Sequence, residues 1–346
     1  MSYKCLQICL KFSLVMLFLL FLQPSRSQGP FAALDETLQT NQKALGKNLV
    51  AMVWKAGDTL VYKKELGEFN SKTQAPLGAA SQWLTAALVM VFVEEGKLSL
   101  DDKVSRWLPE FARYGKNYIT LRTCLAHMTG IKDSESKLFK RTKKTLPEEV
   151  DAYASREIRA NPTQDFWYGE MGPNIAGRVL EIVSKKNFDV LIKQKLFTPL
   201  TMRRTSFSPL DGSAISPASG ALTTADDYIK FLAMLMNKGK FGTKQVLSEE
   251  SIDILLQIQA QTSLYKSAPK EYSQYPYALG SWVMTGQGGK QGAFVCPGFD
   301  GNLAIIDLCK GYALLLLLKE EIDSEKPAIQ LQLKAAADES FGNTCP

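Results

Sequence analysis

The sequence predicts an α/β (α+β) fold: a mainly antiparallel sheet formed by both ends of the chain and flanked by helices, plus a helical subdomain. Short β-rich runs occur near the amino terminus and again from Tyr277 onward. Between them, apolar residues recur at helical spacing. Strands from both termini around a helical middle indicate one sheet with a helical insertion. We expect the sheet part at about 28–75 and 275–346, and the helical part at about 100–270.

The amino-terminal elements are expected to be a helix, a hairpin and a second helix. Ala33–Leu45 has a helical pattern, and Leu49–Trp54 and Thr59–Tyr62 are β-rich runs separated by Ala-Gly-Asp, which is typical of a hairpin. From Trp83 onward the apolar residues recur at helical spacing, and Gly96 closes the run. This stretch therefore predicts one buried helix.

Start and stop signals divide the rest of the chain. Thr120 and Ser248 precede helical stretches as N-caps, and Gly130 is expected to end the first of these helices. The other expected helices are Gly172–Lys186, Phe188–Leu196, Ala225–Met236 and Ala328–Ala337. The expected carboxyl-terminal strands are Tyr277–Met284, Asn302–Asp307 and Tyr312–Leu318.

The first 27 residues have the pattern of a secretory signal peptide. Lys4 and Lys11 precede the apolar run Phe12–Leu22, and small residues follow at a spacing typical of cleavage near Ser27. The apolar run is shorter than the roughly 20 residues that span a bilayer. We therefore expect a secreted chain with a mature domain of residues 28–346 and no stable membrane span.

The charge of the mature chain does not favour nucleic-acid binding. The whole chain carries a formal +6, and removal of Lys4, Lys11 and Arg26 leaves 6 − 3 = +3. The one concentrated basic run is Lys137–Lys144, for which a solvated loop is favoured over a site for an anionic partner.

The cysteines allow disulfides but not the usual zinc site. Two of the 6 cysteines leave with the signal peptide, and an exported chain can pair the four that remain in three ways, which the sequence does not distinguish. These four are Cys124, Cys296, Cys309 and Cys345. There is 1 histidine, His127, and no Cys-x-x-Cys, so we expect no metal and no cofactor.

Seven strings in a fixed order resemble the serine β-lactamase and penicillin-binding protein superfamily, in particular its class C branch and the animal β-lactamase-like proteins. The resemblance covers nearly all of the mature chain. The strings are Val93–Asp102, Ile119–Gly130, Ala176–Val183, Leu196–Met202, Ser219–Asp227, Tyr277–Trp282 and Pro297–Phe299. The resemblance implies the β-lactamase-like fold, with the helix that follows Pro76 at the junction where the cleft forms.

The first catalytic motif of that superfamily is Ser-x-x-Lys, which places a nucleophile and a lysine one turn apart on one helix face. Aligned through Gly78 and Thr85, the serine position holds Ala79 and the lysine position holds Gln82. A methyl group cannot attack a carbonyl, and an amide is neither a useful base nor a cation. Ser81 is rotated by about 200° from Ala79, so we expect a core or helix-packing serine there.

The other two motifs are also altered. In the Tyr-x-Asn motif the tyrosine is kept as Tyr168, but Glu170 replaces the asparagine. We favour a solvated or salt-bridged Glu170 over a catalytic one. Counting back from Pro297, the Lys-Thr-Gly or His-x-Gly motif begins at Gly292, which is not basic. Lys290 lies two residues upstream, so a shifted register of this third motif would restore a cation but not the glycine.

These substitutions favour a secreted protein that has lost serine acyl-transfer activity, a pseudoenzyme that acts by binding or as a structural extracellular component. Its ligand would be a peptide, an ester or a glycan, held near Gln82, Tyr168 and Glu170. The alternative is a hydrolase (an esterase, peptidase or β-lactamase) that uses Tyr168 and Glu170 with a water. A thiol nucleophile at Cys296 is disfavoured against a disulfide or a buried thiol, because nothing nearby in the sequence would lower its pKa.

Overall fold

The computed structural model describes residues 29–132, 145–159, 161–209, 213–285, 292–298, 301–320, 322 and 327–342. The expected signal peptide, the basic run Lys137–Lys144, Lys290 and Cys345 lie outside these residues. Among the helices of the described ranges, none combines the length and the apolar character that a membrane span requires.

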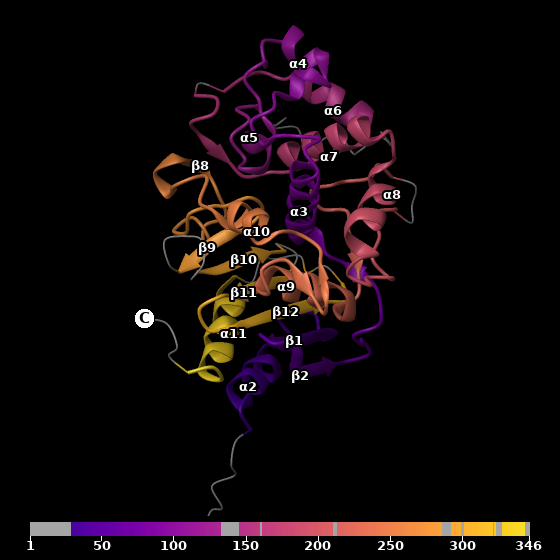
Figure 1. The fold of residues 1–346 in the computed structure, drawn as a ribbon. Coiled ribbons are helices and arrows are strands. Elements are labelled where there is room, and N and C mark those ends of the chain that lie inside the picture. The colour runs from indigo at the N-terminus through magenta and orange to yellow at the C-terminus, as the bar shows by residue number, and fades with distance from the viewer. Residues whose placement is uncertain are drawn as a thin grey trace, which may run out of the picture.

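The described part of the chain contains a six-stranded antiparallel sheet with the strand order β2-β1-β12-β11-β10-β9. Strands from the two ends of the chain are not interleaved in this sheet. β1 and β2 come from the amino-terminal part, and the other four strands come from the carboxyl-terminal part (Figure 1). The bounds are β1 Leu49–Lys55, β2 Thr59–Leu66, β9 Trp282–Thr285, β10 Ala293–Pro297, β11 Leu303–Asp307 and β12 Tyr312–Leu318. The expected α/β (α+β) fold is thus confirmed.

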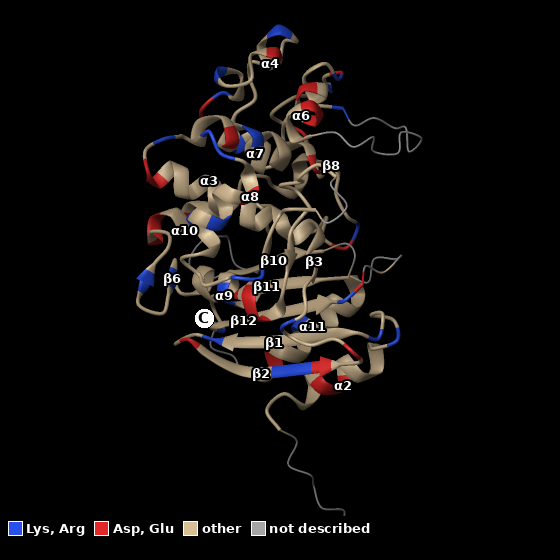
Figure 2. Ribbon diagram, turned by 90° about the vertical axis from the view of Figure 1, so that its right-hand side faces the viewer, with Lys and Arg blue, Asp and Glu red and all other residues tan. Residues whose placement is uncertain are grey.

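Helices cover both faces of this sheet, and that explains its composition. Helix α9 (Ala225–Met236) packs against β12, β1 and β11, while α2 (Ala32–Asn41) and α11 (Pro327–Glu339) pack against each other. Figure 2 shows α9 and α11 on opposite sides of the strands. All seven residues of β12 are buried. A strand covered on both faces has no solvent side, so its sequence is an unbroken apolar run rather than an alternation.

The remaining elements form the helical part and three small two-stranded sheets. The short strands pair as β3 with β5, β4 with β8 and β6 with β7. Their bounds are β3 Ala75–Pro76, β4 Phe166–Trp167, β5 Leu222–Thr223, β6 Lys240–Phe241, β7 Lys244–Gln245 and β8 Tyr265–Ser267. The helices are α3 Ser81–Glu94, α4 Pro109–Arg113, α5 Leu121–Leu125, α6 Leu146–Ala154, α7 Met171–Ser184, α8 Phe188–Ile192 and α10 Glu249–Leu256.

Helix α3 lies between the sheet and the helical part (Figure 1). It packs against α7 and α10, and every residue from Ser81 to Phe92 is buried. A helix enclosed on all sides needs no polar face, which is why its apolar residues do not form a stripe. Its end agrees with the expectation, because Gly96 adopts φ +66° just beyond the last turn.

Most expected elements are confirmed, and several boundaries differ: the strand expected at Tyr277–Met284 begins only at Trp282, and the helix after Thr120 ends early. Thr224 is the N-cap of helix α9: its side-chain hydroxyl accepts a hydrogen bond from the Asp227 N–H at 3.2 Å. Thr120 caps α5 through Thr123 as expected, but this helix ends at Leu125 rather than near Gly130. It ends early because His127 adopts φ +56°, a conformation that no helix continues through. The early end turns the His127 side chain toward α3.

We expect the buried lysine of α11 to hold this helix on the sheet. Lys334 Nζ lies 2.8 Å from Asp307 Oδ2 of β11, and both side chains are almost fully buried. Lys334→Met leaves the Asp307 carboxylate buried without this partner and should lower the free energy of unfolding by about 3–5 kcal/mol. The exposed Lys319→Met is the matched control and should change it by less than about 0.5 kcal/mol. Equal urea midpoints for the two variants would contradict this assignment.

Candidate functional site

Ala79, which the resemblance aligns with the superfamily nucleophile, lies in a short 3-10 helix, η1 (Gly78–Ala80), which leads directly into α3. Ala79 is partly exposed there, whereas Ala80 and Ser81 are buried. Strand β10 flanks η1, and the Cys296 thiol is 3.8 Å from the Ala79 carbonyl oxygen, to which it donates. The structure therefore places Ala79 at a partly exposed position beside β10.

Gln82, three residues further on, takes part in a buried hydrogen-bond network. His127 Nε2 lies 3.0 Å from Gln82 Oε1 and 3.0 Å from the Tyr277 hydroxyl oxygen. The Tyr277 hydroxyl also donates to Gln82 Oε1 at 3.4 Å. Gln82, His127 and Tyr277 are 2%, 4% and 1% exposed. We call these three residues the junction network, because they join α3, the loop after α5 and the segment before β9.

Local backbone geometry brings the three residues together. The Tyr277 N–H and carbonyl oxygen bond to Ala260 at 2.9 and 3.0 Å. Gly280, three residues later, adopts φ +86° and approaches α3 so closely that a Cβ would lie 3.2 Å from the Gln82 carbonyl oxygen. Only glycine meets both conditions without strain. On the other side, the His127 carbonyl oxygen accepts from the Trp167 N–H at 2.9 Å.

Aromatic rings pack around the junction network. The Tyr168 ring centroid is 4.6 Å from that of His127 and 5.5 Å from that of Trp282. Phe166 packs edge-on against His127 at 5.6 Å and stacks on Tyr265 at 4.3 Å. Of these rings, Tyr168 and Tyr265 are partly exposed, whereas Phe166 and Trp282 are buried. The side chain of Tyr168 therefore lies between the solvent and the network.

Burial keeps the titratable groups of this region uncharged. Desolvation lowers the pKa of His127 to about 3 and raises the pKa of Cys296 to about 12, although the Trp83 backbone N–H opposes the second shift in part. Desolvation also raises the pKa of Tyr277 well above its ordinary value. At neutral pH His127 is a neutral imidazole, Cys296 is a thiol and Tyr277 is a phenol. None of the three is an activated nucleophile or a cation.

Ser81 is a structural residue, as its helical angle predicts. Its hydroxyl donates to the Gly78 carbonyl oxygen at 2.6 Å and accepts from the Ala221 N–H at 3.1 Å. Thr85, one turn further along α3, donates in the same way to the Pro217 carbonyl oxygen at 2.7 Å. These contacts hold the segment around Ala221 against α3. They also engage the Ser81 hydroxyl in hydrogen bonds, so it is not free to attack a substrate.

The other two predicted positions contribute differently. Glu170 occupies the N-cap position of α7, is partly buried, and helps to raise the pKa of Tyr153, for which desolvation is the main cause. The Gly292 carbonyl oxygen accepts from the Leu308 N–H at 3.1 Å. The buried Phe294 follows on β10, where the superfamily has the glycine against which a substrate backbone lies. A contact of β10 with Ala79 comes from Cys296 instead of Gly292.

The cysteines correct one expectation. Cys124 and Cys296 are both free and buried, so the pairings that would use either of them do not occur in the structure. Within the described ranges, no three His, Cys, Asp or Glu side chains gather closely enough to hold a metal ion. Of the two states expected for Cys296, a disulfide or a buried thiol, the structure shows the buried thiol.

Sequence analysis missed His127 and Tyr277 as partners of Gln82. The three residues are 45, 150 and 195 positions apart, so no local spacing predicts that they meet. The available signal was chemical: the single histidine and a tyrosine both lie within strings that carry the resemblance, and a buried glutamine needs hydrogen-bond partners.

Comparison with solved structures shows the same architecture. A putative β-lactamase from Bacteroides dorei DSM 17855 superimposes with a TM-score of 0.78 at 24% identity, covering 88% of this chain and 98% of that one. EstCE1, a hydrolase with promiscuous acyltransferase activity, gives a TM-score of 0.74 at 19% identity over 89% of this chain and 99% of its own. At these identities the likeness establishes the fold.

The curated relatives are longer than this chain. Penicillin-binding protein 4 of Amycolatopsis lactamdurans is 27% identical over 169 residues, which are 48% of this chain and 40% of the relative. Protein flp of Staphylococcus aureus (strain N315) is 26% identical over 154 residues, 43% of this chain and 31% of its own. The matched part thus spans less than half of each relative. The family model named Beta-lactamase matches residues 34–338, and because this is most of the sequence, the chain belongs to the β-lactamase family.

Proposed function

We propose that this protein is an exported member of the β-lactamase family that has lost serine acyl transfer and acts by binding. The observation that carries the proposal is the pair at the start of α3. Ala79 has no nucleophilic atom, and the amide of Gln82 is hydrogen-bonded to His127 at 3.0 Å. Acylation needs both a hydroxyl and a base that takes its proton.

Ser81, Cys296 and His127 do not supply the missing groups. The hydroxyl of Ser81 is engaged with Gly78 and Ala221, and the Cys296 thiol has a pKa raised to about 12. His127 is too weak a base to activate either, because its pKa is about 3. These three facts support binding over catalysis.

The proposed ligand is a peptide, an ester or a glycan that contacts the partly exposed Tyr168 or Glu170, with the buried Gln82 beneath the site. The peptide and ester classes are supported by relatives whose names describe acyl chemistry, such as a D-stereospecific amidohydrolase from Streptomyces and the hydrolase EstCE1. The partly exposed Tyr168 offers an aromatic surface to any of the three.

Acylation and turnover assays test the loss of catalysis. The mature protein should not be labelled by a fluorescent penicillin or a fluorophosphonate, and it should not turn over a chromogenic cephalosporin or a p-nitrophenyl ester. Ser81→Ala is the control and should give the same null result. Burst labelling would sink the proposal. Turnover that Tyr168→Phe and Glu170→Gln each abolish would instead assign hydrolysis to those two residues with a water.

Binding has its own readout. In a thermal-shift screen of acyl peptides, esters and oligosaccharides, a true ligand should raise the melting temperature of the wild type and lose that effect in Glu170→Gln or Tyr168→Phe. If no compound raises it while turnover is also absent, a structural role outside the cell becomes the better assignment.

Restoring the motif should not restore activity. Gln82→Lys places an ammonium group against the neutral His127 in a buried site, and should lower the free energy of unfolding by about 2 kcal/mol or more. Ala79→Ser alone adds a hydroxyl at a partly exposed position and should change it by less than about 0.5 kcal/mol. We expect no ester turnover from the folded double variant. Measurable turnover by it would show that the rest of the site is still competent.

Export predicts a specific processing and pairing pattern. Secreted from a eukaryotic host, the mature chain should begin near Gln28, which amino-terminal sequencing will show. Because Cys124 and Cys296 are buried and free, we propose a disulfide between Cys309 and Cys345. Non-reducing peptide mapping should recover these two cysteines in one linked peptide. An uncleaved amino terminus or two free thiols in that pair would argue against export.

A further inference from the structure

The junction network contains the only histidine of the chain. His127 Nε2 contacts Gln82 of α3 and Tyr277, so a single ring nitrogen connects two segments that belong to different parts of the fold. A neutral imidazole with its proton on Nε2 satisfies both contacts, because this N–H donates to Gln82 Oε1 and to the Tyr277 hydroxyl oxygen, while the Tyr277 hydroxyl donates to Gln82 Oε1. An imidazolium would add a charge to a place from which water is excluded.

Among the described residues, the side chains in contact with His127 are aromatic or uncharged amide groups. Ring contacts place the phenols of Tyr168 and Tyr277 and the ring of Phe166 against the imidazole. Desolvation raises the pKa of Tyr277, which stays a neutral phenol, and from α3 the imidazole meets the uncharged amide of Gln82. Along the chain, Glu170 contributes to the raised pKa of Tyr153, and Asp165 lies 3.8 Å from Lys266.

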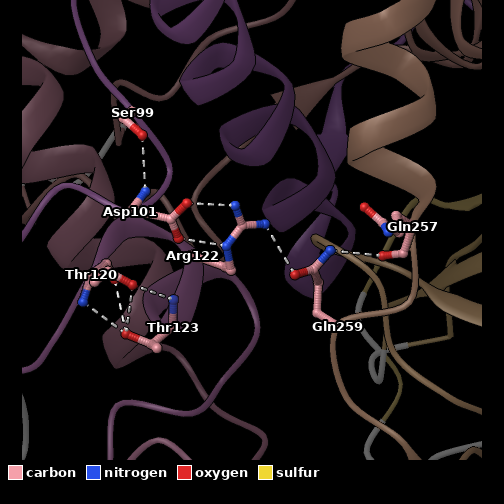
Figure 3. Close-up of polar contacts among 7 residues, drawn as sticks. All are labelled: Ser99, Asp101, Thr120, Arg122, Thr123, Gln257 and Gln259. Atoms are coloured by element: carbon pink, nitrogen blue, oxygen red, sulfur yellow. Dashed lines mark hydrogen bonds and ion pairs between the residues drawn. The ribbon is translucent and has the colours of Figure 1, made fainter.

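A second connection holds the same regions together and behaves differently in acid. Arg122 of α5 forms a double hydrogen bond with Asp101, at 2.7 and 2.9 Å, and donates to Gln259 Oε1 at 3.2 Å (Figure 3). The Gln259 N–H donates to the carbonyl oxygen of Tyr277 at 2.8 Å, which links this clamp to the network. The Arg122 hydrogen bonds hold the pKa of Asp101 below its ordinary value, so the clamp stays charged at mildly acidic pH.

We propose that the junction network is an acid-sensitive latch: it opens locally as His127 takes up a proton, while the Arg122 clamp keeps the two regions connected. This inference does not depend on the proposed binding function. Opening would expose Gln82, Tyr277 and the inner face of Tyr168, and would alter the surface beside Ala79. A protein that is exported passes through compartments of different acidity, and such a latch would respond to them.

The direction of the pH effect follows from linkage. The His127 pKa is about 3 in the closed state and about 6.5 in an open or unfolded chain. The open state therefore binds a proton first, and the contribution of His127 to stability is complete above about pH 6.5 and is lost as the pH falls toward 3. Between pH 7.5 and 5 the opening equilibrium constant should rise about thirtyfold from this one residue.

The single histidine allows a direct test without mutation. In a tag-free mature protein, the NMR signal of the imidazole ring should stay that of a neutral ring while the protein remains closed, and a second, protonated signal should appear only with the open form. A smooth titration of the closed form with a midpoint near pH 6.5 would overturn the proposal, because a solvated imidazole does not drive opening.

Two variants separate titration from simple loss of contacts. His127→Gln removes the proton site, so its opening equilibrium should lose the thirtyfold pH dependence. Tyr277→Phe removes a partner of His127 and keeps the imidazole, so it should open more at every pH and retain the dependence. Parallel pH profiles of the wild type and His127→Gln would overturn the latch. If His127→Gln does not fold, the NMR titration of the wild type decides.

Hydrogen exchange locates the opening. After correction for the intrinsic rate, amides of the segments that carry His127 and Tyr277 should exchange faster at pH 5 than at pH 7.5, whereas amides of α9 and β12 should not. Asp101→Asn weakens the clamp and should spread the acid-induced exchange into α5. Uniform acceleration across the sheet would show global unfolding instead of a latch and would overturn the local-opening proposal.

Discussion

The complete burial of α3 constrains everything that surrounds it. Polar side chains on this helix are under strong pressure to find a partner, because a buried unpaired group costs about 1–3 kcal/mol, and among the described residues the Trp83 indole N–H is an exception. Ser81 and Thr85 find theirs in the segment from Pro217 to Ala221, and Gln82 finds His127. These pairings point to two different sides of the helix. They fasten α3 to one chain segment on each side and thereby define the junction between the sheet and the helical part.

The same constraint explains how the fold accommodates a glutamine at position 82. A lysine at position 82 would need charged or strongly polar neighbours, whereas a glutamine is satisfied by a neutral imidazole and a phenol. The surrounding rings of Phe166, Tyr168 and Trp282 keep water away and maintain that neutrality. The side chains around Gln82 are thus neutral, buried and hydrogen-bonded to one another. Such an environment suits a stable junction better than proton transfer.

Stability at the opposite end of the molecule has a different basis. There, α11 is attached to the sheet by a buried ion pair, with Lys334 between Asp307 and Asp338. The Tyr312 hydroxyl adds a hydrogen bond to Asp338 at 2.7 Å. This ion pair joins α11 to β11, whereas the junction network joins α3 to the segments that carry His127 and Tyr277.

Much of the fold could be predicted because it rests on local patterns. The apolar run Tyr312–Leu318, the caps at Thr120 and Ser248, and the glycine after α3 each act within a few residues, so the sequence alone determined these elements and, through the ordered strings, the family. Through the resemblance, it also placed Ala79 and Gln82 at the positions where the superfamily carries its catalytic pair. What only the tertiary structure decided is the environment of Gln82. Its partners lie 45 and 195 residues away, and His127 reaches it only because α5 ends early in a left-handed turn. Such meetings depend on the packing of whole elements, which no local pattern encodes.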